Sequence, residues 1–199
     1  MTRKPSTTVA ATPQEDLAVV RAMVQELEDY LLGDQVYRTL VIPTEHGQER
    51  VQSSGGDLLA RLHKLHGQEA LLSLDERIQL HELDRQVADI THRFHHQWRT
   101  LLVRELKARL NSLKWYLDEY ESDRRSGRVN YPFKIRNRQR IAEIWKALQD
   151  DPPPNLAAEI AAVDKRLRAI TVAAPFVWDD KVRSVYPQDE YWYLYVLPA

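Results

Sequence analysis

The sequence predicts a mainly α-helical protein, a helical bundle built around one very long helix over about residues 73–125. Two observations lead to this fold class. Apolar residues recur at three- and four-residue spacing along most of the chain, and residues 75–125 contain neither Gly nor Pro. A small β-hairpin or extended segment near residues 35–52 and an aromatic C-terminal strap complete the expected fold.

A capping box marks the start of the folded region. Thr12 and Glu15 have the spacing of an N-cap residue and its reciprocal partner, and an apolar stripe follows them. Gly33 is a natural end for this first helix. We therefore expect residues 1–12 to form a flexible N-terminal tail ahead of a single helical domain over residues 13–199.

Turn residues mark the next elements. Residues 35–42 are rich in β-branched and aromatic side chains, which favours a strand, and a turn and a short second strand follow. Residues 53–56 contain adjacent serines and glycines, and we expect a flexible break there. Asp57 is then expected to cap a short helix that ends at Gly67.

The long helix is predicted from a second capping box and an uninterrupted helical pattern. Ser73 and Glu76 form the box. A helix over residues 75–125 would be about 76 Å long at about 1.5 Å per residue. Its apolar stripe shifts around the helix axis near Leu102. Such a shift indicates either a kink or one long helix that packs against different neighbours at its two ends. Because no helix-breaking residue lies there, we favour the continuous helix.

The C-terminal third is expected to contain two more helices and an aromatic segment. We place the end of the long helix at residues 126–127, a fourth helix over residues 132–150 and a fifth over residues 156–170. Of the 17 aromatic residues, 7 lie in the last 24 positions. They can form a docking surface, since Tyr and Trp are common interface anchors, or a strap that packs on the bundle. We favour the strap.

Overall composition limits the chemistry that the chain can perform. The sequence has no Cys, which excludes disulfides, thiolate catalysis and Cys-ligated metal centres. The formal net charge of −1 gives no diffuse attraction to nucleic acid or to a membrane surface. No apolar run approaches the roughly 20 residues of a membrane span. We expect a cytoplasmic protein that binds no membrane.

A histidine-rich stretch of the long helix is a candidate metal site. Asp89, His92 and His96 lie at i, i+3 and i+7, so that one carboxylate and two imidazoles share a helix face. The same polar stripe lies opposite an apolar one, which is also typical of an ordinary solvent-exposed face. The second interpretation is the stronger one.

The most specific indication of function is a run of basic residues. From residue 124 to residue 140 the chain carries seven positive and no negative side chains, and Tyr131 and Phe133 lie among them. Arginine forks suit phosphates, and aromatic rings stack on bases. The alternative is pairing with nearby acidic residues. The candidate anion- or nucleic-acid-binding residues are Arg124, Arg125, Arg128, Lys134, Arg136, Arg138 and Arg140. The acidic residues considered as their partners are Asp118, Glu119, Glu121, Asp123 and Glu143.

The sequence favours a binding protein over an enzyme. It has no glycine-rich nucleotide loop and no nucleophile elbow, and we expect no cofactor. We expect a non-enzymatic helical binding or scaffold protein, whose partner is another protein or a second copy in a homo-oligomer. The alternatives are nucleic-acid or phospholigand binding through residues 124–140, and a metal-dependent activity at the histidine face. Since residues 124–140 contribute +7, the rest of the chain sums to −8, and a local anion site remains compatible with the near-neutral total.

Overall fold

The computed structural model describes residues 11–44 and 47–199. These residues are mainly helical, as expected, with two small antiparallel hairpins. The α-helices are α1 (Pro13–Gln25), α2 (Leu27–Leu32), α3 (Gly55–Gly67), α4 (Leu74–Arg93), α5 (His95–Ser122), α6 (Arg124–Lys134), α7 (Arg136–Ala147) and α8 (Leu156–Ile170). The strands are β1 (Arg38–Thr44), β2 (Gly47–Ser53), β3 (Thr171–Ala173) and β4 (Val196–Pro198). The short 3₁₀ helices are η1 (Glu69–Leu71), η2 (Asp180–Val185) and η3 (Trp192–Leu194).

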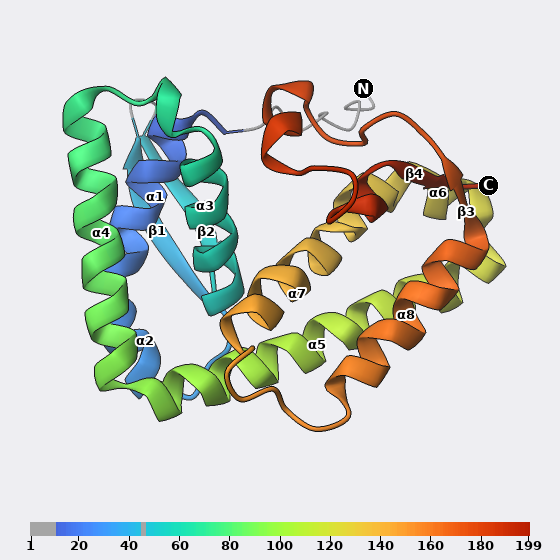
Figure 1. The fold of residues 1–199 in the computed structure, drawn as a ribbon, viewed down its shortest axis with the longest axis horizontal. Coiled ribbons are helices and arrows are strands. Elements are labelled where there is room, and N and C mark those ends of the chain that lie inside the picture. Colours follow the sequence, from blue (N-terminus) through green and yellow to red (C-terminus); the bar gives the residue numbers. More distant parts are fainter. Residues whose placement is uncertain (1–10, 45–46) are drawn as a thin grey trace.

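The elements form two groups that α5 connects (Figure 1). Helices α1, α3 and α4 and the β1–β2 hairpin lie together at one side of the molecule. Helix α5 runs from the C-terminal end of α4 to the other side of the molecule, where α7 and α8 lie along it. Each group has its own apolar core, and Trp98 packs against both.

The first apolar cluster is built from the stripes of α1 to α4. Leu17, Val20 and Val24 of α1 meet Leu80 and Leu83 of α4 in this cluster, which is almost entirely aliphatic. The β1–β2 hairpin closes one side of it, in the region where the sequence predicts a hairpin or an extended segment. The helix predicted to run to Gly33 is divided at Glu26 into α1 and α2.

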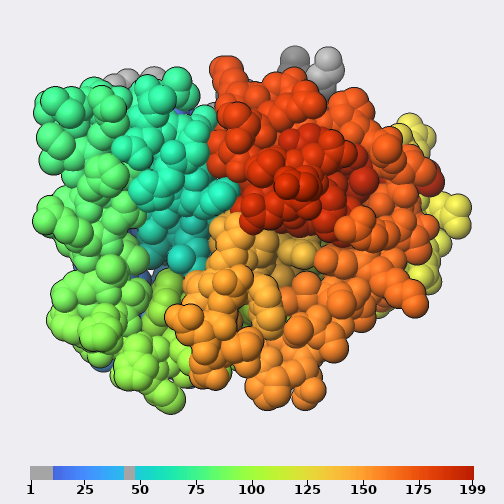
Figure 2. Space-filling view, viewed as in Figure 1, coloured from blue at the N-terminus to red at the C-terminus, as the bar shows by residue number. Residues whose placement is uncertain are grey.

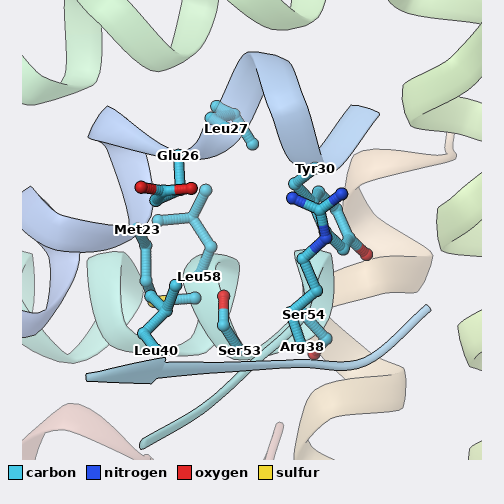
Figure 3. A pocket seen from close by; sticks show the side chains of 9 residues that line it. All are labelled: Met23, Glu26, Leu27, Tyr30, Arg38, Leu40, Ser53, Ser54 and Leu58. Carbon is cyan, nitrogen blue, oxygen red and sulfur yellow. The ribbon is translucent and has the colours of Figure 1, made fainter. Parts of the chain in front are cut away.

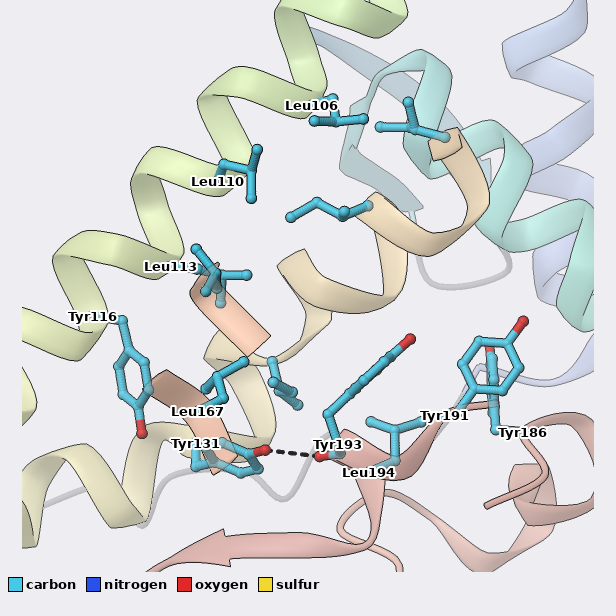
Figure 4. Packing of buried hydrophobic residues seen from close by; sticks show 14 of the residues in the cluster. Leu106, Leu110, Leu113, Tyr116, Tyr131, Leu167, Tyr186, Tyr191, Tyr193 and Leu194 are labelled. Atoms are coloured by element: carbon cyan, nitrogen blue, oxygen red, sulfur yellow. Dashed lines mark hydrogen bonds between the residues drawn. The ribbon is translucent and has the colours of Figure 1, made fainter. Parts of the chain in front are cut away.

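The second cluster joins α5, α6, α7 and α8 to the residues that follow α8, 171–199, which we call the C-terminal segment. Figure 4 shows Leu106, Leu110 and Leu113 pointing from α5 into this cluster, with Tyr131 and Tyr193 hydrogen-bonded below them. The C-terminal aromatic cluster is therefore part of the core, as the strap interpretation predicts. In the space-filling view the C-terminal segment lies directly against α3 (Figure 2).

The single long helix was a wrong prediction. The helix breaks at Phe94, where φ is −111° and ψ is 35°, and α4 and α5 meet there at a marked bend. The bend brings the residues up to Leu101 onto the first cluster, whereas Leu102 begins the second. Phe94 is neither Gly nor Pro, so burial on two separate cores determines this break, and local helix propensity does not reveal it.

Two other boundaries differ from the prediction. Ser54, rather than Asp57, is the N-cap of α3, and its side chain accepts the Asp57 N–H. Residues 126–127 lie inside α6 because Asp123, whose side chain accepts the Ser126 N–H at 3.0 Å, caps that helix instead. Pro132, predicted to begin the fourth helix, also lies inside α6, and that fourth helix is α7.

The capping boxes and the last helix were predicted correctly. Thr12 with Glu15 and Ser73 with Glu76 each form both reciprocal hydrogen bonds, and α8 covers the predicted fifth helix. The predicted flexible tail falls on residues that are outside the described part, except for its last two. No helix among the described residues is long and apolar enough to cross a membrane.

Candidate functional site

A buried polar seam joins α3, α5 and α7 where the two apolar clusters meet. The seam consists of Ser54, Asp57, Glu105, Arg109 and Arg140. Glu105 is completely buried at its centre. Its carboxylate accepts hydrogen bonds from the Gly56 N–H at 2.8 Å and from Arg109 Nε at 2.7 Å. Burial raises the pKa of Glu105, and the Arg109 charge opposes that change.

Two carboxylates compete for one hydroxyl in the seam. Ser54 Oγ lies 2.9 Å from Asp57 Oδ2 and 2.7 Å from Glu105 Oε1, and it carries one proton for both. Asp57 has two cationic neighbours, with Arg140 Nε at 3.0 Å and Arg109 Nη2 at 3.4 Å. Burial alone would raise the pKa of Asp57, but the two arginines hold it below its ordinary value.

The glycine pair at the start of α3 allows the backbone of α3 to lie this close to α5. A Cβ on Gly56 would lie 2.5 Å from Glu105 Oε1, and one on Gly55 would lie 2.7 Å from Leu102 Cδ2. Any side chain at these positions would push α5 away from the first turn of α3. Residues 53–56, which we expected to be a flexible break, are therefore a tightly packed helix start.

Hydrogen bonds continue the seam toward the C-terminal segment. Arg140 Nη1 donates to Gln139 Oε1 at 3.1 Å, and Gln139 Nε2 donates to Glu143 Oε1 at 3.1 Å. The Tyr191 hydroxyl donates to the same carboxylate oxygen at 2.8 Å. Burial and the bond to Glu143 raise the pKa of Tyr191, so the phenol keeps its proton and holds the C-terminal segment on α7.

The outer end of this network reaches α3. Lys146 Nζ donates to the Tyr191 hydroxyl at 2.8 Å. His63 Nε2 lies 3.1 Å from the same hydroxyl and 3.2 Å from the Val185 carbonyl oxygen. His63 and Tyr191 therefore connect α3 to the C-terminal segment, which identifies the group as a structural junction between distant parts of the chain.

The seam residues were not predicted as a group. A usable signal was present, since Glu105 and Arg109 lie at i, i+4 on the buried face of α5, among Leu102, Leu106 and Leu110. An ion pair inside an apolar stripe indicates a buried polar contact with another element. The partners from α3 and α7 are distant in sequence and could not be identified from it.

The structure divides the predicted basic segment between two helices, and several of its charges have partners. Arg138 forms two hydrogen bonds with Asp164, at 2.7 and 2.9 Å, and Arg140 pairs with Asp57. Arg128 donates to the carbonyl oxygen of Pro198. In the described part of the chain, no carboxylate lies within ion-pair distance of the remaining candidates. These are Arg124, Arg125, Lys134 and Arg136.

The histidine face is divided by the break at Phe94. His92 lies on α4 and His96 on α5, while Asp89 pairs with Arg93 at 3.3 Å. Residues 11–44 and 47–199 contain no group of three or more His, Asp or Glu side chains placed to hold a metal ion. The observed geometry gives no support to a metal site here.

Three exposed apolar side chains lie at the end of η1 and the start of α4. Leu71, Leu74 and Ile78 are 63%, 65% and 59% exposed, and we call them the α4 ridge. An open groove of about 510 Å³ runs beside the ridge between α1 and α4. Arg21, Asp75 and Glu82 are among the residues that line it.

A second hollow lies under the β1–β2 hairpin. It is lined by residues of α1, α2, the hairpin and α3, including Tyr30, Arg38 and Ser54 (Figure 3). Its volume of about 10 Å³ matches a single water molecule rather than an organic ligand.

Comparisons with known proteins return no relative. No protein-family model matches the chain, and no curated protein or solved structure matches it.

Proposed function

We propose that this chain is a non-enzymatic helical binding or scaffold protein that docks a protein partner, or a second copy of itself, on the α4 ridge. The observation that carries this proposal is the exposure of Leu71, Leu74 and Ile78 within eight residues. Burying one Leu or Ile side chain contributes about 1.5–3 kcal/mol, so three such side chains close together in the sequence can anchor an interface.

The surroundings of the ridge have the anatomy of an interface. The groove beside it carries both charge signs, with Arg21 on α1 and Asp75 and Glu82 on α4. An apolar centre with a mixed polar rim is typical of docking surfaces between proteins. The ridge comprises the last residue of η1 and two residues at the start of α4, whereas the polar seam joins α3, α5 and α7.

Site-specific photo-crosslinking in the expressing cell tests this proposal. A photoreactive residue replaces Ile78, and the matched control carries it at Leu32, which is at least as exposed, on α2. We expect a discrete crosslinked product from position 78 that the control lacks. Mass spectrometry then distinguishes a second copy from another protein. Equal and diffuse crosslinking from both positions would refute docking at the ridge.

A second candidate function is the binding of a nucleic acid or another phosphate-bearing ligand on the outer face of α6. Arg124 and Arg125 are exposed in the first turn of this helix, which carries no acidic residue. Phe133 and Val129 on the same helix are 65% and 66% exposed. Arginines beside an exposed aromatic ring suit a single-stranded nucleic acid.

Fluorescence anisotropy with a single-stranded oligonucleotide tests the second candidate. Reversal of both charges in Arg124→Glu/Arg125→Glu should abolish binding, and affinity should fall steeply with salt concentration. The control Arg77→Glu/Lys107→Glu changes the net charge equally at exposed positions on α4 and α5. The candidate is rejected when both double variants bind alike or when salt has no effect.

A further inference from the structure

Four titratable side chains form a closed ring where the C-terminal end of α3, η1 and α4 meet. On one side, His66 Nε2 lies 3.0 Å from Asp84 Oδ2, and His66 Nδ1 lies 3.8 Å from Glu69 Oε2. On the other side, His81 Nε2 lies 3.0 Å from Glu69 Oε1, and His81 Nδ1 lies 3.9 Å from Asp84 Oδ2. Imidazoles and carboxylates therefore alternate, and every imidazole nitrogen in the ring faces a carboxylate oxygen.

The number of N–H groups in this ring depends on pH. A neutral imidazole carries one N–H and a lone pair on its other nitrogen, whereas the charged form carries two N–H groups. When both histidines are neutral, each of them sets one lone pair against a carboxylate oxygen, and this contact opposes its hydrogen bond. When both are charged, every contact is attractive and the charges of the ring balance. The imidazole centres are 6.3 Å apart, so repulsion between them opposes the second proton.

Among the described residues, no other charged group pairs with the members of the ring. Glu69 and Asp84 lie within ion-pair distance of the two histidines and of no Lys or Arg there. The hydrogen bond to Asp84 raises the pKa of His66, as expected where the charged form is favoured. The neighbouring charged residues of α3 and α4 have partners of their own, which are Lys64 with Asp16 and Arg85 with Glu82.

The ring contacts η1, a short 3₁₀ helix that has no buried residue of its own. Two backbone hydrogen bonds close η1: the Leu71 N–H donates to the carbonyl oxygen of Gln68 at 2.9 Å. The Leu72 N–H donates to that of Glu69 at 3.0 Å. Gln68 and Leu72 are buried and anchor the two ends of η1. Between these anchors, the Glu69 side chain binds η1 to α3 through one histidine and to α4 through the other.

We propose that His66, Glu69, His81 and Asp84 form a pH-dependent clasp, which holds η1 against α3 and α4 in mild acid and lets η1 open in mild alkali. The clasp responds to solvent protons because the two imidazole side chains are 41% and 58% exposed. Leu71 belongs both to η1 and to the α4 ridge, so the clasp also positions one of the three ridge side chains. Only this last consequence rests on the proposed docking function.

Titration of the imidazole signals by nuclear magnetic resonance tests whether the two histidines share one ring. His81→Gln removes a positive charge close to His66, so the midpoint of the His66 titration should rise by about 0.5 on the pH scale. Glu69→Gln removes a carboxylate that faces both imidazoles and should lower both midpoints. His92→Gln is the matched control for His81→Gln, because His92 is exposed on α4 without an ionic partner in the described chain. Equal His66 midpoints in His81→Gln and His92→Gln would overturn the shared ring.

Amide hydrogen exchange at Leu71 and Leu72 tests whether the ring holds η1. After correction for the intrinsic rate at each pH, protection in the wild type should be about two- to fivefold higher near pH 6 than near pH 8. Glu69→Gln should remove this dependence. Asp75→Asn should keep it, because Asp75 is an exposed carboxylate of α4 without an ionic partner among the described residues. Equal protection at both pH values in the wild type, or an unchanged dependence in Glu69→Gln, would overturn the clasp.

The clasp and the docking at the α4 ridge can fail separately. Titration and exchange use the isolated protein, so both results stand when crosslinking at position 78 shows no docking. Conversely, loss of the pH dependence at η1 refutes the clasp and leaves a crosslinked product at position 78 unaffected.

Discussion

The two apolar clusters are held together in different ways. The first is almost entirely aliphatic, with Tyr30 its one aromatic residue among the fully buried members that the structure describes. The second contains six tyrosines, and several donate hydrogen bonds to distant carbonyl groups, such as Tyr131 to Tyr193 at 2.8 Å and Tyr195 to Tyr186 at 2.7 Å. Aliphatic packing tolerates small shifts, whereas these hydrogen bonds fix where the C-terminal segment lies.

The polar seam between the clusters should be the most sensitive point of the molecule. Glu105→Ala leaves Arg109 buried without its closest partner, and removing one member of a buried pair costs about 3–5 kcal/mol. We expect a loss of this size in the free energy of unfolding, measured by urea denaturation. The double variant Glu105→Leu/Arg109→Met, which removes both charges, should recover much of it. A Glu105→Ala variant as stable as the wild type would show that the seam does not join the clusters.

Leu80→Ala tests the aliphatic cluster. Leu80 is completely buried on α4, and truncation of such a leucine costs about 2–5 kcal/mol. Four of the five tryptophans follow Trp98 in the sequence and belong to the second half of the molecule. Tryptophan fluorescence therefore reports mainly on that half. Because the seam couples the halves, fluorescence and far-ultraviolet circular dichroism should give the same urea midpoint. Two separate midpoints would show that the clusters unfold independently.

The sequence predicts the aliphatic half better than the aromatic half for a physical reason. Capping boxes, such as the pair Ser73 and Glu76, and apolar stripes are local, and both are readable along the chain. The break at Phe94 depends on burial against two cores, which no residue near it encodes. The fold class and most helices were therefore predictable, and the path of the chain between the clusters was not.

The difference between local and long-range contacts also explains which parts of the candidate site could be predicted. Pairing of the basic segment was anticipated, but with acidic residues close in sequence. The actual partner of Arg140 is Asp57, 83 positions away, and that of Arg138 is Asp164, 26 positions away. Charge counting along the sequence therefore shows a local run of positive residues, but it cannot show which of them form ion pairs in the fold.

A pair of tyrosines isolates the contribution of a hydrogen bond in the aromatic cluster. Tyr131→Phe leaves the Tyr193 carbonyl without its donor and should cost about 1 kcal/mol. Tyr193→Phe is the matched control, because its own buried hydroxyl has no partner within the described residues. We expect that variant to be as stable as the wild type or more so, by thermal denaturation. Equal losses in the two variants would mean that packing alone positions the C-terminal segment.

The smallest expected effect concerns the junction of α3 with α4. A hydrogen bond from His66 to Asp84 raises the pKa of the imidazole, burial opposes this, and Glu69 adds to the rise. The protonated form is therefore favoured by the fold, and its stabilisation is complete below the unfolded value of about 6.5 and disappears as the pH rises through the folded pKa. His81, which also contacts Glu69 and Asp84, shares these carboxylates. Since the His66 side chain is 41% exposed, the contribution should stay below about 1 kcal/mol.

Unfolding free energies of the wild type and His66→Gln, measured on both sides of neutral pH, check this expectation. The difference should be largest in mild acid and should vanish in mild alkali, because only the charged imidazole attracts Asp84 and Glu69. His95→Gln, at an exposed position on α5 without an ionic partner in the described chain, should show no such pH dependence. A difference that grows with pH would mean that His66 stabilises this junction as a neutral ring.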